Sequence, residues 1–312
     1  MSLHTVYPSI KEGIVAFVAR HFEFAGNESQ AFPPILGTGF VVRESGLIAT
    51  NHHVIKAFKK IPKLPNTKDK DWSAAAFLLK WHKEGDLMGI LELPLFIEGV
   101  FVVGAFDPGK VYYGPPKPDI AFVKVKATGL SPLSVDSSVE IREGLAVATA
   151  GFPMGRDALA APGWIHQLTP TLQTGIVSAV MPFPCPTPHA FAINVMTQGG
   201  ASGSPVFLPG DGRVIGILHA GLIDPLPVSQ KAAIPLPTTI SHVVPAHYIT
   251  NSLDSIERDR ATDLEPAPDT KSLEEIVESA TLVDRFSDES AYEITPACGI
   301  SEERLVRRSL DS

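Results

Sequence analysis

The sequence predicts an all-β fold, a sandwich or barrel of antiparallel strands, and two observations support this. Short apolar runs rich in β-branched residues recur along most of the chain. The 25 glycines and 28 prolines largely separate these runs, and both residue types form turns and interrupt regular structure. The chain has 312 residues, of which 44% are hydrophobic and 19% charged. It can therefore bury a large core, and its composition excludes a wholly disordered protein.

The expected elements follow one another from the N-terminus. A short helix is expected to begin at SIKE (9–12), which has the spacing of a capping box. GIVAFVA (13–19) is interpreted as the first strand, although Ile14, Phe17 and Val18 also fit one face of a helix. The other expected strands are GTGFVV (37–42), GLIAT (46–50), GVFVVGAF (99–106), DIAFVKV (119–125), GLAVATAGF (144–152), LQTGIVSAV (172–180), FAINVMT (191–197) and GRVIGIL (212–218).

One segment, 55–98, interrupts this pattern and is expected to be a partly helical insertion between strands. It opens with six lysines against two aspartates. Trp72, Ala75, Ala76 and Leu79 then follow at helical spacing.

The C-terminal extension, residues 253–312, has the opposite charge. From about residue 252 the chain holds 16 Asp and Glu against 7 Lys and Arg. A helix is expected over 272–283, after the linker 265–270. One hypothesis is that this acidic tail contacts the basic part of the insertion, or a regulatory partner, and controls access to a cleft. The alternative is that both segments are solvated surface.

Small residues crowd around a pair of serines, Ser202 and Ser204, in QGGASGSPVF (198–207). Because strand-like runs flank this stretch, it is interpreted as a shaped turn and not as a linker. A serine becomes a nucleophile when a base takes its proton and donors hold the resulting oxyanion. The flanking glycines would let the backbone N–H groups of Gly200 and Ser202 converge on one point.

The partners for such a serine stand at the ends of two other expected strands. GLIATNHHVI (46–55) places two histidines just after an apolar run. In PPKPDIAFVKV (115–125), Asp119 begins an alternating strand. Hydrolysis of an amide by serine requires such a histidine and, usually, a carboxylate that fixes its tautomer. The chain order is His, Asp, Ser.

These blocks together resemble the trypsin-like serine peptidases of the chymotrypsin clan, in particular the disulfide-poor Deg (HtrA) branch. GTGFVV, IATNHHV, DIAFVKV, QTGIVSAV and GGASGSPVF…GRVIGILHAG match that pattern in order, from about residue 14 to 250. The resemblance implies two antiparallel β-barrels of chymotrypsin type, an N-terminal one in 1–130 and a C-terminal one in 131–252. The remaining residues, 253–312, are expected to be too few for the PDZ domain that Deg proteases carry.

The resemblance also assigns roles to individual residues. His53 is the base, because it directly precedes Val in the TNxHV block, and His52 fills the variable position. Asp119 matches the carboxylate, and Ser202 the nucleophile in Gly-x-Ser-Gly. The backbone N–H groups of Gly200 and Ser202 would then form the oxyanion hole.

The specificity pocket follows from the same motif alignment. Met196 is placed near its floor and Gly221 on its wall, and Leu218 points inward if the strand alternates. The same alternation turns His219 away from the pocket and towards Asp119. No acidic side chain is available there to bind Lys or Arg, so cleavage after small or medium apolar residues is expected.

The expected partner is a polypeptide substrate, and the expected mechanism needs no metal and no organic cofactor. A net charge of −8 argues against nucleic-acid binding, and no apolar run reaches the roughly 18 residues that span a membrane. With only Cys185 and Cys298 and no recognisable signal peptide, a cytoplasmic location is expected. Two alternatives stay open: an inactive peptide-binding module with a protease fold, or a peptidase or esterase dedicated to one partner.

Overall fold

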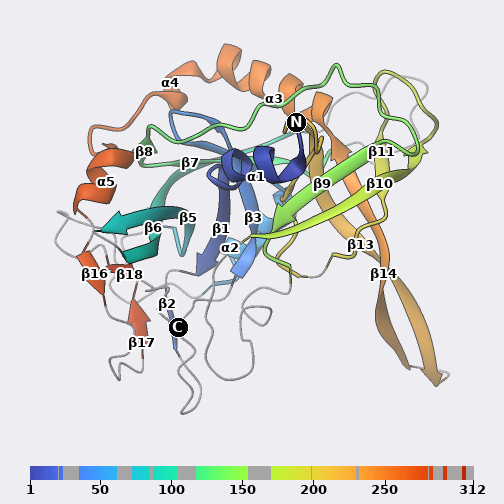
Figure 1. Ribbon diagram of the computed structural model, residues 1–312, viewed down its shortest axis with the longest axis horizontal. Helices are drawn as coiled ribbons and strands as arrows, with labels where there is room; N and C mark the ends of the chain where they lie inside the picture. Colours follow the sequence, from blue (N-terminus) through green and yellow to red (C-terminus); the bar gives the residue numbers. More distant parts are fainter. Residues whose placement is uncertain are drawn as a thin grey trace.

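Two closed β-barrels of six antiparallel strands each form the body of the protein in a computed structural model (Figure 1). The structure describes residues 1–19, 21–23, 35–61, 72–84, 87–104, 117–153, 170–197, 199–229, 232–279, 281–283, 291–293 and 304–306. This architecture confirms the predicted all-β fold with two barrels.

The N-terminal barrel takes all its strands from the first 125 residues. Around the barrel their order is β1 (Ile14–Ala19), β3 (Ile35–Arg43), β4 (Leu47–Thr50), β7 (Ala121–Val125), β6 (Leu87–Val102) and β5 (Ala74–Glu84). Pairing of β5 with β1 closes it.

The C-terminal barrel follows in the chain and is closed in the same way. Its order is β10 (Thr171–Met181), β11 (Ala190–Ile193), β14 (Ala232–Pro245), β13 (Val214–Ser229), β12 (Pro205–Phe207) and β9 (Ala146–Gly151). The C-terminal part of β13 pairs with the N-terminal part of β14 in a long hairpin, which extends beyond the barrel at the lower right of Figure 1.

Helices and short strands complete the described part of the chain. The helices are α1 (Leu3–Lys11), α2 (His52–Phe58), α3 (Ala246–Asp259), α4 (Ala261–Leu264) and α5 (Leu273–Ser279). The short strands pair as β15 (Lys271–Ser272) with β8 (Ala127–Thr128), β16 (Thr281–Val283) with β18 (Arg304–Val306), and β17 (Ala291–Glu293) with β2 (His21–Glu23). Among the described helices none is long and apolar enough to cross a membrane.

Every residue of the first strand, β1, is apolar because both faces of the strand are buried in the core. Successive side chains of a strand point to opposite faces, and both faces of β1 are covered. Val15 and Phe17 pack in a cluster with α2 and α5, while Ile14, Ala16 and Val18 pack in a second cluster that also holds residues of the C-terminal barrel, α1 and α3. A third cluster belongs to the C-terminal barrel.

Helix α1 lies earlier than the capping-box spacing predicts. It spans Leu3–Lys11, and the Ser9 hydroxyl donates to the carbonyl of Val6 and does not begin the helix. Val6 and Ile10, four residues apart on one face, are buried against the core between the barrels. Tertiary burial of that face therefore sets the position of the helix.

The prediction of a partly helical insertion over 55–98 is wrong in its main part. Within that range the helix α2 ends at Phe58, and residues 74–84 and 87–98 belong to β5 and β6. These two strands are members of the barrel, because they supply the partners that β1 and β7 need. The alanines that suggested helical spacing are buried within β5. The basic residues between 62 and 71 lie outside the described residues.

The acidic tail is attached to the N-terminal barrel. Leu273 and Ile276 of α5 are buried in the cluster that holds Val15 and Phe17 of β1. Strand β15 pairs with β8 in parallel. Ser272 and Glu275 form a capping box: the Ser272 backbone N–H donates to Glu275 Oε2 at 2.7 Å, and the Glu275 N–H donates to Ser272 Oγ at 3.1 Å. Lys126 pairs with Asp269 at 2.5 Å. These contacts involve the barrel; whether the tail meets the basic segment stays a hypothesis.

Candidate active site

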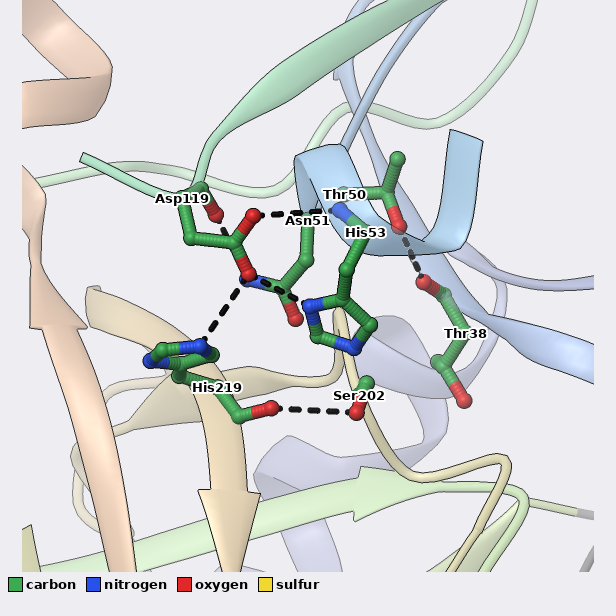
Figure 2. Close-up of polar contacts among 7 residues, drawn as sticks. All are labelled: Thr38, Thr50, Asn51, His53, Asp119, Ser202 and His219. Atoms are coloured by element: carbon green, nitrogen blue, oxygen red, sulfur yellow. Dashed lines mark hydrogen bonds and ion pairs between the residues drawn. The ribbon is translucent and has the colours of Figure 1, made fainter. Parts of the chain in front are cut away.

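The first turn of α2 positions His53 at the edge of the N-terminal barrel. Strand β4 ends at Thr50, and the helix begins two residues later. Val54, Ile55 and Phe58 are buried and fix the helix on the barrel. The His53 side chain remains 43% exposed and faces Asp119, as Figure 2 shows.

The carboxylate of Asp119, just before β7, is bound to His53 by two contacts. His53 Nδ1 lies 2.5 Å from Asp119 Oδ2, and the His53 backbone N–H donates to Oδ1 at 3.0 Å. Asn51 Nδ2 donates to the backbone carbonyl of Asp119 at 2.8 Å. Burial acts to raise the pKa of Asp119, but the hydrogen bonds from His53 and the charges of His53 and His219 outweigh it, so this pKa lies below its usual value. The group is therefore an anion at neutral pH.

His219 of β13 brings a second imidazole to the same carboxylate. Its Nε2 lies 3.2 Å from Asp119 Oδ2, which confirms the direction predicted from strand alternation. Burial, with the nearby charges of His53 and His242, lowers the pKa of His219 although Asp119 acts to raise it. His219 therefore acts on Asp119 through its charge, whereas His53 also forms hydrogen bonds with that carboxylate.

Ser202 lies on the other side of His53. Figure 2 shows the outer ring nitrogen of His53, Nε2, directed towards the Ser202 side chain. The Ser202 hydroxyl donates to the backbone carbonyl of His219 at 3.0 Å. The Ser202 hydroxyl makes no other hydrogen bond to a described residue, and so none to His53. The three side chains thus gather at one place, with the hydroxyl turned away from the imidazole.

Thr38 of β3 holds the Ser202 loop across the two barrels. Its backbone N–H donates to the carbonyl of Ser202 at 2.8 Å, and its Oγ1 donates to the carbonyl of Gly200 at 2.7 Å. The Phe152 N–H donates to the same Oγ1 at 3.1 Å, and Thr50 Oγ1 donates to the Thr38 carbonyl at 2.7 Å. Sequence reasoning missed this residue; its signal is a hydroxyl within the otherwise apolar run GTGFVV.

The expected oxyanion donors are available. Gly200 has φ of +95°, a left-handed conformation that glycine adopts without strain. In the described part of the chain no acceptor takes the N–H of Gly200 or of Ser202, whereas the Gly203 N–H donates to the carbonyl of Leu218 at 2.9 Å. The N–H groups of Ser202 itself and of Gly200, two residues earlier, are therefore without an acceptor among the described residues.

The three predicted pocket residues have different environments. Met196 is 44% exposed, and Gly221 packs so closely on Thr197 that a Cβ there would lie 2.9 Å from Thr197 Oγ1. Leu218 is buried in the core of the C-terminal barrel. A pocket built from these residues stays a prediction.

His53, Asp119 and His219 are also, among the described residues, the one group of three side chains with metal-ligating atoms close together. Their ligand atoms all lie within 4.8 Å of one another.

Comparison with known proteins adds three findings. A family model described as a trypsin-like peptidase domain matches residues 37–217, more than half of the chain. A curated protein of Halomonas elongata, described as a "probable periplasmic serine endoprotease DegP-like", is 29% identical over 182 residues. That match covers 58% of this chain but only 28% of the relative, so the chain spans under a third of its length.

Solved structures give the third finding. The serine endoprotease from Yersinia pestis is 19% identical, with a TM-score of 0.47, over 83% of this chain and 68% of that chain. An HtrA-type protease with a tripeptide is 15% identical, with the same TM-score, over 83% of this chain and 64% of that chain.

Proposed function

The chain belongs to the family of trypsin-like peptidases, and from that premise we propose that it is a serine endopeptidase acting through an acyl-enzyme on Ser202. The observation that carries the proposal is the hydrogen-bonded pair of His53 and Asp119, whose imidazole is directed towards Ser202. The N–H groups of Gly200 and Ser202, which have no acceptor among the described residues, support it further.

In the proposed mechanism each group has one task. The Ser202 hydroxyl rotates from the carbonyl of His219 towards His53, whose Nε2 takes the proton as the oxygen attacks the substrate carbonyl. Asp119 keeps the other proton on Nδ1 and stabilises the imidazolium. The N–H groups of Gly200 and Ser202 bind the oxyanion. His53 then gives its proton to the leaving amine, and water releases the acyl group by the same steps.

The proposed substrate is a polypeptide with a small or medium apolar residue before the cleaved bond. This preference rests on the alignment of Met196 and Gly221 with a pocket and on the absence of an acid from the predicted pocket set. Profiling with a peptide library tests it, and a preference for Glu, Lys or Arg would contradict it. A cytoplasmic location is likewise retained as a proposal, which fractionation of cells into cytoplasm and periplasm tests.

Mass spectrometry of a casein digest tests the activity itself. Wild-type protein is expected to yield new peptide ends, and Ser202→Ala to lower kcat by about 10⁴-fold or more. Ser137→Ala, at an exposed serine, is the matched control and is expected to cleave like wild type. Equal digestion by Ser202→Ala and wild type would overturn the assignment of the nucleophile.

One observation favours a second candidate, a peptide-binding module that does not cleave. The Ser202 hydroxyl donates to the carbonyl of His219 and not to His53. If that bond is permanent, a fluorophosphonate will not label Ser202, and a peptide will bind without being cut. If the hydroxyl rotates, labelling is rapid. Comparison of casein with simple acyl esters then separates a general endopeptidase from an esterase or an enzyme with one dedicated substrate.

A further inference from the structure

A second imidazole on the carboxylate of Asp119 changes what this site can bind. Three elements that are far apart in the sequence supply the groups: α2, the segment before β7, and β13. His53 Nδ1 lies 2.5 Å and His219 Nε2 3.2 Å from the same oxygen, Asp119 Oδ2. The two rings lie 5.6 Å apart between centroids and 40° from parallel.

Two imidazoles and one carboxylate are a ligand set that suits divalent transition-metal ions. Zinc binds His nitrogen and carboxylate oxygen at about 2.0–2.2 Å, so neighbouring ligand atoms of a tetrahedral site lie about 3.3 Å apart. The distance of 3.2 Å between His219 Nε2 and Asp119 Oδ2 already has this value. The contact between His53 and Asp119 must lengthen by about 1 Å for both atoms to bind one ion. The two imidazole nitrogens, which lie within 4.8 Å of each other, must reach the same separation of about 3.3 Å.

The site is also open to an ion from solution. The side chains of His53 and His219 are 43% and 41% exposed, and that of Asp119 is 20% exposed. Three protein ligands leave the fourth position of a tetrahedral ion to water.

We propose that His53, Asp119 and His219 form a binding site for a zinc-type divalent ion, and that this ion reversibly inhibits the peptidase. The inhibitory half of this proposal rests on the proposed function, whereas the binding half does not. Catalysis needs no metal in this scheme; the ion competes with it.

The inhibition follows from the tautomer of one imidazole. A neutral imidazole carries one proton, and a ring nitrogen that binds a metal cannot carry it. When His53 Nδ1 binds the ion, its proton moves to Nε2, the nitrogen that must accept the proton of Ser202. The ion also takes Asp119 Oδ2 from its hydrogen bond with His53. Both changes remove the general base while leaving Ser202 itself in place.

The first experiment measures binding alone, in a Ser202→Ala background that carries no nucleophile. Co²⁺, a spectroscopic substitute for Zn²⁺, is titrated while the visible absorption of the ion is followed, and Zn²⁺ is titrated by calorimetry. One site per chain is expected. His219→Gln retains a side-chain N–H for Asp119 but lacks the imidazole, and it is expected to weaken binding more than about 10-fold, since loss of even an outer partner of a metal ligand costs about 10–100-fold.

His4→Gln, the same change at an exposed histidine of α1, is the matched control and is expected to leave the affinity unchanged. Absence of binding, or equal affinity in His219→Gln and wild type, would overturn the site. His242, a neighbour of His219, is tested in the same way; a loss confined to His242→Gln would also overturn the assignment.

The second experiment measures inhibition. Labelling of Ser202 by a fluorophosphonate is expected to slow as Zn²⁺ is added and to recover with a chelator. The variant His219→Gln is compared with its own labelling rate without metal. Halving that rate is expected to need at least 10-fold more Zn²⁺ than in wild type. Failure of labelling without any metal would refute the proposed function while the Co²⁺ titration still decides the site. Labelling that Zn²⁺ does not change would refute the inhibition.

Discussion

Gly203, directly after Ser202, is a position where only glycine fits. Its φ is +92°, and a Cβ there would lie 1.9 Å from the Thr38 carbonyl oxygen and 2.5 Å from Thr50 Oγ1. A left-handed conformation costs an alanine at least about 1 kcal/mol, and the clash with backbone atoms adds to this. Gly203→Ala is therefore expected to lower Tm by at least about 2 °C and to slow labelling of Ser202.

Gly199, four residues earlier in the same loop, supplies the control. A Cβ there meets no atom within 4 Å. Gly199→Ala is expected to keep the wild-type Tm by differential scanning calorimetry. If both alanine variants unfold at the same temperature as wild type, the close approach of the loop to β3 does not contribute to stability.

Thr38 is expected to matter for rate as well as for stability. Thr38→Val keeps the shape of the side chain and removes the hydroxyl that binds the Gly200 carbonyl and the Phe152 N–H. The unpaired buried groups cost about 1–3 kcal/mol. Because a displacement of about 1 Å at reacting groups costs about 10²-fold in rate, kcat is expected to fall at least about 10-fold.

Rescue distinguishes the two effects of Thr38. Thr38→Ser retains the hydroxyl and is expected to recover most of kcat, as measured with a peptide substrate at saturating concentration. If Thr38→Val loses stability in urea unfolding but keeps the kcat of wild type, the hydroxyl supports the fold and does not position the loop that carries Gly200 and Ser202.

Sequence reasoning reached the residues proposed to do chemistry better than those that support them. His53, Asp119 and Ser202 stand in short motifs with a fixed order, so a resemblance identifies them even though their meeting requires the whole fold. The direction of His219 towards Asp119 was predicted from the motif alignment together with strand alternation, and the contact is present although the register of β13 shifts between Leu218 and Ala220. Thr38 gave no comparable signal, because a threonine in a strand usually reflects β-propensity and the two partners of its hydroxyl lie more than 100 residues away.

The strands β5 and β6 show how local patterns mislead. Alanine has the highest intrinsic helix propensity, and Trp72, Ala75, Ala76 and Leu79 have helical spacing. In the structure Ala74 and Ala76 pack in one cluster and Phe77 in the other, which is the two-residue alternation of a strand. Closure of the barrel overrides propensity here, because β1 would otherwise present an unpaired edge.

Helix α3 carries a histidine that makes stability depend on pH. Burial, with the charge of His189, lowers the pKa of His247 to about 4. An unfolded chain binds this proton near pH 6.5, so the unfolded state gains protons first as pH falls. Stability from this group is therefore complete above about pH 6.5 and is lost as pH falls towards 4.

His247→Gln is expected to reduce that dependence. The difference in Tm between pH 7 and pH 4.5 should be smaller in His247→Gln than in wild type. In the control His4→Gln this difference should equal that of wild type. An identical difference in His247→Gln would mean that His247 takes up its proton equally in the folded and unfolded states.

The two barrels supply different halves of the site, so their mutual position determines whether it is assembled. His53 and Asp119 belong to the N-terminal barrel and Ser202 to the C-terminal one. The cluster between the barrels combines Phe40 and Phe122 of the first with Phe207 and Val214 of the second. Helix α1, before the first barrel strand, and helix α3, after the last, both contribute to it.

This arrangement places the expected domain boundary at 252/253 inside a helix. Helix α3 runs over Ala246–Asp259, and Leu253 is buried in the cluster between the barrels, with Ile256 packed against it. The part of the tail that joins the inter-barrel core is therefore short, whereas α5 packs on the N-terminal barrel alone.

Two truncated chains separate these roles. A chain ending at residue 264 keeps all of α3 and is expected to label at Ser202 at a rate near that of wild type. A chain ending at residue 252 loses Leu253 and Ile256, and its barrels are expected to separate enough for labelling to fall at least 10-fold. Both chains lack α5, so the comparison isolates residues 253–264, which form the end of α3 and all of α4. Equal labelling of the two would mean that the barrels keep His53 and Ser202 together without help from these residues.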